Sequence, residues 1–184
     1  MGDDELVEQA QGGDARAFGR LVERHQRRLC ATLTKMTGDS DLALDVTQDA
    51  FIRAWVGLDK FERRAAFSTW LYRIAVRLAY DVMRREGPRD ARDVDDSFAD
   101  PGPGPDARIE QSTESEALRR RIAELPEMQR AVVTLRTYNE MPYKEIAVIL
   151  ETTENSARVS FHHAISRLSE GYERDGLYKE SCSS

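Results

Sequence analysis

The stretch from Leu42 to Glu86 reads LALDVTQDAFIRAWVGLDKFERRAAFSTWLYRIAVRLAYDVMRRE, and it holds both tryptophans of the 184-residue chain. Its charge changes sign halfway along. Residues 41–59 include four aspartates and one arginine, whereas residues 60–85 include seven basic and two acidic side chains, a net charge of +5. Five aromatic residues are interleaved with the basic ones. Because cations follow phosphates while rings stack on exposed bases, the second segment favours contact with single-stranded nucleic acid.

A buried helix face is the alternative explanation for the second segment. Leu71, Ala75, Leu78 and Val82 recur at helical spacing, which predicts an amphipathic helix with one face against a core. Trp70 suits a core as well as a base contact, since large aromatic side chains dominate core burial. The arginines suit a solvated face. The nucleic-acid interpretation is favoured by the order of the parts, because an acidic helix, an aromatic and basic loop and a second helix follow in one run.

The composition favours small helical domains, and the net charge argues against a general nucleic-acid coat protein. Hydrophobic residues make up 40% of the chain and charged residues 33%, which favours small helical domains over one large core. The net charge is −6, and residues 87–116 account for all of it, with nine acidic residues and three arginines. Any contact with nucleic acid must therefore come from local basic patches.

Several other classes of protein lack support in the sequence. Cys30 and Cys182 lie far apart without a pairing pattern, and the acidic N-terminus has no apolar signal region. The longest apolar run is Ile146–Leu150, so we expect a cytoplasmic protein with no membrane insertion. His162 and His163 diverge by roughly 100° on a helix and share one ion poorly. No glycine-rich phosphate loop and no Ser-His-Asp or Cys-His arrangement is recognisable either. We therefore expect no catalytic residues, no metal site and no cofactor, and we expect that the protein is not an enzyme.

The N-terminal part predicts a bundle of about four helices. A short first helix stops at Gly12, and Asp14 is suited to cap the start of a long second helix that Gly38 closes. Asp39 or Ser40 can cap the acidic helix that follows. The helix containing Trp70 then runs to about Glu86, before a Gly-Pro pair. No alternating pattern calls for strands.

The rest of the chain predicts a linker, a second domain and a tail. Residues 87–114 are acidic and rich in proline and glycine, with almost no apolar anchors, so we expect a flexible linker. Residues 115–171 predict short helices that include a helix-turn-helix. Its second helix, Asn155–Leu168, has no acidic residue and is the candidate recognition helix. Residues 172–184 form the tail.

Four short motifs stand out, DVTQDAF at Asp45–Phe51, FSTWLYRIA at Phe67–Ala75, LPEMQR at Leu125–Arg130 and YKEIA at Tyr143–Ala147. They resemble motifs of one family, the extracytoplasmic-function (ECF) group of sigma-70-type transcription factors. The first resembles the D-hydrophobic-T-Q-E-x-F helix of sigma region 2. Phe67–Ala75, FSTWLYRIA, resembles the F-x-T-W-L-Y-R-I-A signature of the same region. Leu125–Arg130, LPEMQR, is similar to the L-P-E-x-Q-R start of region 4, and Tyr143–Ala147, YKEIA, is similar to its S/Y-x-E-I-A helix.

The resemblance implies an all-α chain of two small helical domains, a region 2 helical bundle at 1–86 and a region 4 helix-turn-helix at 115–171. It implies an alternative bacterial sigma factor, which binds core RNA polymerase and directs promoter-specific transcription initiation in a stress or environmental response. The implied partners are the β′ clamp helices and the β flap of the core, promoter DNA, and an anti-sigma factor.

The resemblance also assigns residues to three surfaces. The acidic helix would dock on core polymerase, through Asp45, Gln48, Asp49 and Arg53. The loop and helix after it would capture and hold the −10 element, through Phe61, Arg63, Arg64, Phe67, Trp70, Arg73, Arg77, Tyr80, Arg84 and Arg85. The recognition helix would read the −35 element, through Asn155, Ser156, Arg158, Val159, His162 and His163.

Two departures from the family pattern affect the expected DNA contacts. The loop at 62–66 has no glycine, although the family usually has one there, and positive φ angles are costly without it. We therefore expect this loop to follow a different path. The recognition helix lacks the usual second and third arginines, with Ser160, His163 and Ile165 near those places. Fewer cations predict weaker phosphate anchoring and a smaller dependence of binding on salt.

Two other functions remain open from the sequence. A stand-alone helix-turn-helix regulator explains the second domain but leaves the motifs between Asp45 and Arg73 without a role. An adaptor or anti-sigma-like protein that never contacts DNA predicts that replacing Arg77 or Arg158 by alanine leaves promoter binding unchanged.

Overall fold

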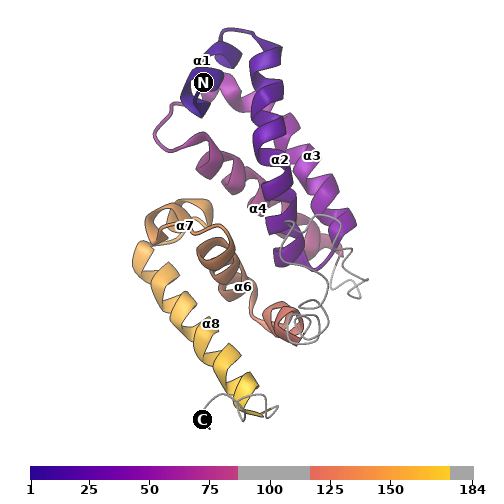
Figure 1. The fold of residues 1–184 in the computed structure, drawn as a ribbon, viewed down its shortest axis with the longest axis vertical. Coiled ribbons are helices and arrows are strands. Elements are labelled where there is room, and N and C mark those ends of the chain that lie inside the picture. The colour runs from indigo at the N-terminus through magenta and orange to yellow at the C-terminus, as the bar shows by residue number, and fades with distance from the viewer. Residues whose placement is uncertain (87–116, 175–184) are drawn as a thin grey trace, which may run out of the picture.

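The computed structural model describes residues 1–86 and 117–174. In these two ranges all regular secondary structure is helical, and Figure 1 shows an N-terminal and a C-terminal group of helices side by side. The prediction of an all-α chain with two helical domains is confirmed. The predicted linker at 87–114 and residues 175–184 of the predicted tail lie outside the described residues.

The N-terminal half is a helical bundle whose boundaries are set by capping residues. The Asp14 carboxylate accepts hydrogen bonds from two backbone N–H groups of the following turn, and the Asp39 carboxylate accepts one from Leu42. These bonds satisfy donors that the start of a helix leaves unpaired. Gly38 ends the second helix with a φ of 73°, which glycine adopts without strain. The elements are α1 (Asp3–Gln11), α2 (Ala15–Thr37), α3 (Ser40–Gly57), the short 3₁₀-helix η1 (Leu58–Lys60) and α4 (Phe67–Glu86).

The C-terminal half begins, in the described residues, with a helix at 117–124 that ends before Pro126. After it come α6 (Glu127–Val133), the π-helix η4 (Thr134–Tyr138), α7 (Tyr143–Ile149) and α8 (Glu154–Arg174). Non-helical residues 139–142 separate η4 from α7, and α7 and α8 form the predicted helix-turn-helix. The π-helix continues directly from α6, a feature that the apolar spacing does not predict.

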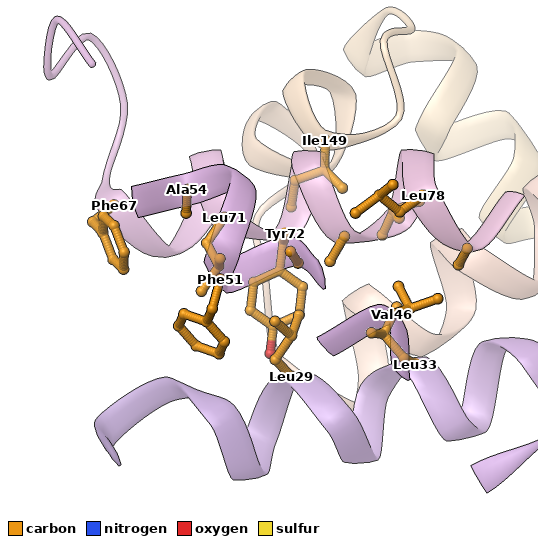
Figure 2. Close-up of a cluster of buried hydrophobic side chains, with 14 of the residues drawn as sticks. Leu29, Leu33, Val46, Phe51, Ala54, Phe67, Leu71, Tyr72, Leu78 and Ile149 are labelled. Carbon is orange, nitrogen blue, oxygen red and sulfur yellow. The ribbon is translucent and has the colours of Figure 1, made fainter. Parts of the chain in front are cut away.

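One hydrophobic core extends through both halves. Figure 2 shows Ile149, from α7, lying against the same cluster as Leu71 and Leu78 of α4. Ile149 is only 3% exposed, and burial of a side chain of this size contributes about 1.5–3 kcal/mol. A smaller cluster packs the C-terminal helices against one another, and it is made of Leu125, Val133, Ala164 and Leu168. The C-terminal half therefore has some core of its own but also depends on the N-terminal bundle.

A buried polar cluster lies at the junction of the halves. The Asn139 side-chain amide donates hydrogen bonds to the hydroxyls of Thr32 (3.0 Å) and Tyr72 (2.9 Å). The Thr32 hydroxyl donates to the Arg28 carbonyl (2.7 Å), and the Arg28 guanidinium donates to the Asn139 carbonyl (3.1 Å). Burial raises the pKa of the Tyr72 phenol, although the nearby Thr32 hydroxyl and Arg28 oppose the shift. The junction thus combines apolar contact with a closed set of hydrogen bonds.

Replacing Asn139 by alanine removes the donor to two buried hydroxyl groups, and an unsatisfied buried group costs about 1–3 kcal/mol. We expect scanning calorimetry to show one unfolding transition for the wild type and two for Asn139→Ala, because the halves no longer unfold together. Thr137→Ala is the matched control, since the exposed Thr137 hydroxyl bonds only the Val133 carbonyl within its own helical run. A profile of Asn139→Ala identical to that control would contradict this role.

Candidate nucleic-acid and partner interfaces

The four residues assigned to polymerase binding lie on the exposed side of α3. Asp45, Gln48, Asp49 and Arg53 are all exposed. Within residues 1–86 and 117–174, none of the four side chains makes a hydrogen bond or an ion pair. Their polar groups are therefore directed to solvent, and their contact with polymerase stays a prediction.

The same side of α3 also carries apolar residues that sequence reasoning missed. Leu44 is 43% exposed, Ile52 61% and Val56 76%. They are spaced by multiples of four residues, so they share one helix face with the aspartates. The sequence could have indicated this exposure, because these three residues do not share the helical spacing of the buried residues Leu42 and Val46. An exposed stripe that mixes carboxylates with large aliphatic side chains is suited to a protein partner.

The aromatic residues around the loop at 61–66 form its base. Phe67 is 1% and Phe61 8% exposed. The Phe61 ring stacks on Trp70 with centroids 4.7 Å apart and meets Phe67 edge to face at 6.2 Å. Trp70 is half-buried. Core packing accounts for Phe67 and, in part, for Trp70, for which the sequence left a core position open. The contact of these rings with a base stays a prediction.

The loop itself takes a positive φ at a residue other than glycine. Arg63 has a φ of 57°, a conformation that is strained for residues with a Cβ atom. Arg63 and Arg64 are both exposed, and the Arg64 guanidinium pairs with Glu62 at 2.6 Å. The loop thus adopts a positive φ at Arg63 although it has no glycine. That its path differs from the family's stays a prediction.

Two of the cations assigned to the −10 element are bound by acidic residues of the C-terminal half. Two Arg73 nitrogens donate to one Glu151 carboxylate oxygen, at 3.0 and 2.6 Å. Arg84 lies 3.8 Å from the Glu127 carboxylate, and the Tyr80 hydroxyl donates to the Glu127 carbonyl at 3.2 Å. The face of α4 that carries them is therefore turned toward α6 and α7.

The remaining assigned residues of α4 face solvent. Arg77 and Arg85 are exposed, and Arg85 donates to the Asp81 carbonyl of its own helix at 3.1 Å. Thr69, in the FSTW motif, is 1% exposed because α7 covers it, and its hydroxyl donates to Glu145 at 3.0 Å.

Sequence reasoning missed the acidic partners of α4, which are Glu127, Glu145 and Glu151. Arg73 holds the pKa of the Glu151 carboxyl below its usual range, through the hydrogen bond first and its charge second. Burial, and then the charge of Glu127, raise the pKa of the Tyr80 phenol. The lysine and arginine pattern alone could not identify these partners, because they lie some 40 to 80 positions along the chain.

All six residues assigned to the −35 element lie exposed on α8. The Thr153 hydroxyl caps the helix start by accepting from the Ser156 N–H at 3.1 Å. The helix begins at Glu154, whose carboxylate pairs with Arg158 at 2.9 Å. The Arg158 guanidinium also lies over the Tyr143 ring, 5.3 Å from its centroid. The one assigned arginine of this face is therefore partly neutralised.

The described residues contain no group of three His, Cys, Asp or Glu side chains that could hold a metal ion. None of the helices that the structure describes has the length and apolarity needed to cross a membrane.

Known proteins share both motif regions of the chain. A family model described as sigma-70 region 2 matches residues 21–89, and one described as sigma-70 region 4 matches residues 115–168. The ECF RNA polymerase sigma-E factor of Escherichia coli K12 is 38% identical over 166 residues, which cover 85% of this chain and 86% of that protein. The RNA polymerase sigma-H factor of Pseudomonas aeruginosa is 34% identical over 167 residues, with the same coverage.

Two solved structures resemble the fold over most of its length. CnrH, in complex with the cytosolic domain of CnrY, matches with a TM-score of 0.72 and 28% identity, covering 94% of this chain and 98% of that one. The sigma factor RpoE from Bartonella quintana, in complex with the anti-sigma factor NepR, matches with a TM-score of 0.67 and 20% identity, covering 86% and 98%. The second match concerns the fold alone.

The Glu151 contact predicts a dependence of stability on pH. Because the folded-state pKa is lowered, the carboxylate stabilises the fold above its ordinary pKa of 4.5, and this stabilisation is lost as pH falls through the lowered value. We expect Glu151→Gln to reduce the free energy of unfolding at neutral pH, and the difference from wild type to vanish in acid. Denaturant unfolding across this pH range measures it.

Glu140→Gln is the matched control for that measurement. Glu140 is an exposed turn residue with a φ of 56°, close to the 52° of Glu151. Identical pH profiles for the two variants would show that the Arg73 contact contributes nothing.

Proposed function

Since the chain belongs to the ECF group of sigma-70 factors and is an alternative sigma factor that directs transcription, we propose which of its surfaces perform each step of initiation. The observation that carries the proposal is the combination of an unpaired acidic and apolar face on α3 with a basic face on α4. The α3 face is suited to a protein partner, and the α4 face is suited to a polyanion. The two faces lie on consecutive helices of one bundle.

The α3 face is proposed as the docking surface for the β′ clamp helices of core polymerase. Ile52 and Val56 would supply apolar contact, while Asp45 and Asp49 would form charge-assisted hydrogen bonds with basic side chains of the partner. These residues have no intramolecular role among the described residues, so docking disrupts nothing in the fold.

The loop at 61–66 and α4 are proposed to bind the −10 element. Unstacking a base costs a few kcal/mol, which stacking and pocket contacts must offset. Arg73, Arg77, Arg84 and Arg85 would hold the DNA backbone, because guanidinium groups bind phosphate as they bind carboxylate. The exposed residues 155–163 of α8 are proposed to read the −35 element while the C-terminal half contacts the β flap.

The arrangement in Figure 1 represents a closed state in this proposal. Glu127 and Glu151 occupy Arg84 and Arg73, so these cations cannot bind phosphates until the halves separate. Core polymerase would open the chain by holding each half at a separate site. An anti-sigma factor that binds the closed form would keep the factor inactive.

The proposal gives the protein no catalytic chemistry of its own. Promoter melting would draw its free energy from binding, and the polymerase would carry out RNA synthesis. The protein would act in the cytoplasm, where polymerase and chromosome are.

Transcription from fragmented genomic DNA of the source organism, with its own core polymerase, tests the function. We expect discrete start sites that share two upstream elements. Stable core binding without any transcript, or no core binding, would contradict the assignment.

Ile52→Ala tests the docking surface in the same assay. We expect about a tenfold weaker affinity for core, since truncating a central apolar contact typically costs 1 kcal/mol or more. Gln26→Ala is the control, because Gln26 is an exposed residue of α2 outside the proposed docking face. Equal core affinities for the two variants would exclude the α3 face as proposed.

A further inference from the structure

The loop at 61–66 reaches its strained conformation with help from outside the loop. Arg63 holds a φ of 57° without glycine at this position. A short exposed loop with such strain would relax to other conformations unless surrounding groups held it.

Gln11, the last residue of α1, makes those contacts with a single amide group. Its side-chain N–H groups donate to the carbonyls of Leu58 (2.9 Å) and Phe61 (3.0 Å), which precede the strained Arg63. Its side-chain carbonyl accepts from the Arg63 guanidinium at 2.8 Å. Glu8, one turn earlier on α1, lies 3.6 Å from the same guanidinium. One amide therefore binds both the backbone that leads into the turn and the side chain of the strained residue.

Helix α1 is itself firmly held, so it can serve as an anchor. Leu6, Val7 and Ala10 are at most 4% exposed. The Asp3 carboxylate joins α1 to α2 through His25 at 2.7 Å, and the His25 ring packs near Phe67, with centroids 5.6 Å apart. The side chain of Gln11 is half-buried between this anchor and the loop.

We propose that Gln11 is a positioning residue for promoter selection, which holds the 61–66 loop in the path needed to discriminate bases of the −10 element. The inference rests on the proposed role of the loop in −10 binding. The region 2 family match begins at residue 21, so α1 lies outside the segment that the family model covers. The loop has no glycine, and the Gln11 contacts offset the cost of the positive φ at Arg63.

The first test compares Gln11→Leu with Gln9→Leu. Gln9 is an exposed glutamine of the same helix whose side chain reaches only Met1. Each variant transcribes, with saturating core polymerase, a promoter library randomised over the −10 element, and transcript sequencing gives base-preference ratios. Losing two hydrogen bonds to the loop predicts about a tenfold fall in the preference ratio for Gln11→Leu. Gln9→Leu keeps the wild-type ratio.

Rescue separates loop positioning from a general loss of stability. In the Gln11→Leu background, Arg63→Gly and Arg63→Ala both remove the guanidinium, but only glycine relieves strain at positive φ. Both variants lose the Arg63 guanidinium assigned to the −10 element, so the comparison between them isolates strain relief. We expect Arg63→Gly to give a higher preference ratio than Arg63→Ala. Equal effects of the two would overturn the inference.

Trypsin cleavage at Arg63 and Arg64 gives a readout that does not depend on transcription. We expect mass spectrometry to show faster cleavage at these two bonds in Gln11→Leu than in Gln9→Leu, with cleavage elsewhere unchanged. Unchanged cleavage would overturn the anchoring role, and faster cleavage with unchanged base preference would overturn the selection role. A wild-type chain that gives no promoter-specific transcripts would instead overturn the proposed function together with this inference.

Discussion

The joint between the two halves depends on the buried amide of Asn139, which donates to hydroxyls of Thr32 and Tyr72 on two different N-terminal helices. In a low-dielectric interior such a cluster is stable only when all of its members are paired. A joint of this kind fixes one relative position of the halves, because sliding by one residue would leave several groups unsatisfied. It is also separable, since Asn, Thr and Tyr side chains regain hydrogen bonds to water when they are exposed. Purely apolar contact would hold the halves together more permanently, so the polar cluster at the junction suits the proposed opening of the chain.

The basic face of α4 has two possible ligands of similar chemistry. Carboxylates of the C-terminal half bind Arg73 and Arg84 in the closed state, and DNA phosphates are proposed to bind them in the open state. Because both ligands are anions that accept from guanidinium groups, they compete for the same donors.

Three residues other than glycine have positive φ in the described ranges, namely Arg63, Glu140 and Glu151. One lies in the proposed base-selecting loop, and the others lie in the two turns that flank α7. Backbone strain is thus found in the loop that is proposed to read bases and beside the Arg73–Glu151 contact.

Local features of the fold could be predicted from sequence, whereas its long-range pairings could not. Asp14, Gly38 and Asp39 act as caps as expected, because capping depends on residues within one turn. The exposure of Asp45 and Asp49 follows from helical periodicity. The pairing of Arg73 with Glu151 does not, since sequence periodicity carries no information about contacts between separate helices. Phe67 illustrates a further limit, because an aromatic residue in a motif fits both core and base contact until its burial is known. The Gln11 contacts join the end of α1 to residues about 50 positions later in the chain, which no local pattern encodes.

The most direct test of this account is the distance between the two halves, measured by pulsed electron paramagnetic resonance. Spin labels at Arg20 on α2 and Arg167 on α8, both exposed, would report the distance in the free chain and after core polymerase and promoter DNA are added. The account predicts one narrow distance in the free chain and a longer one in the promoter complex, because the carboxylates must leave α4 before DNA can bind it. An unchanged distance in a transcriptionally active complex would contradict the account, since the acidic residues would then still occupy Arg73 and Arg84.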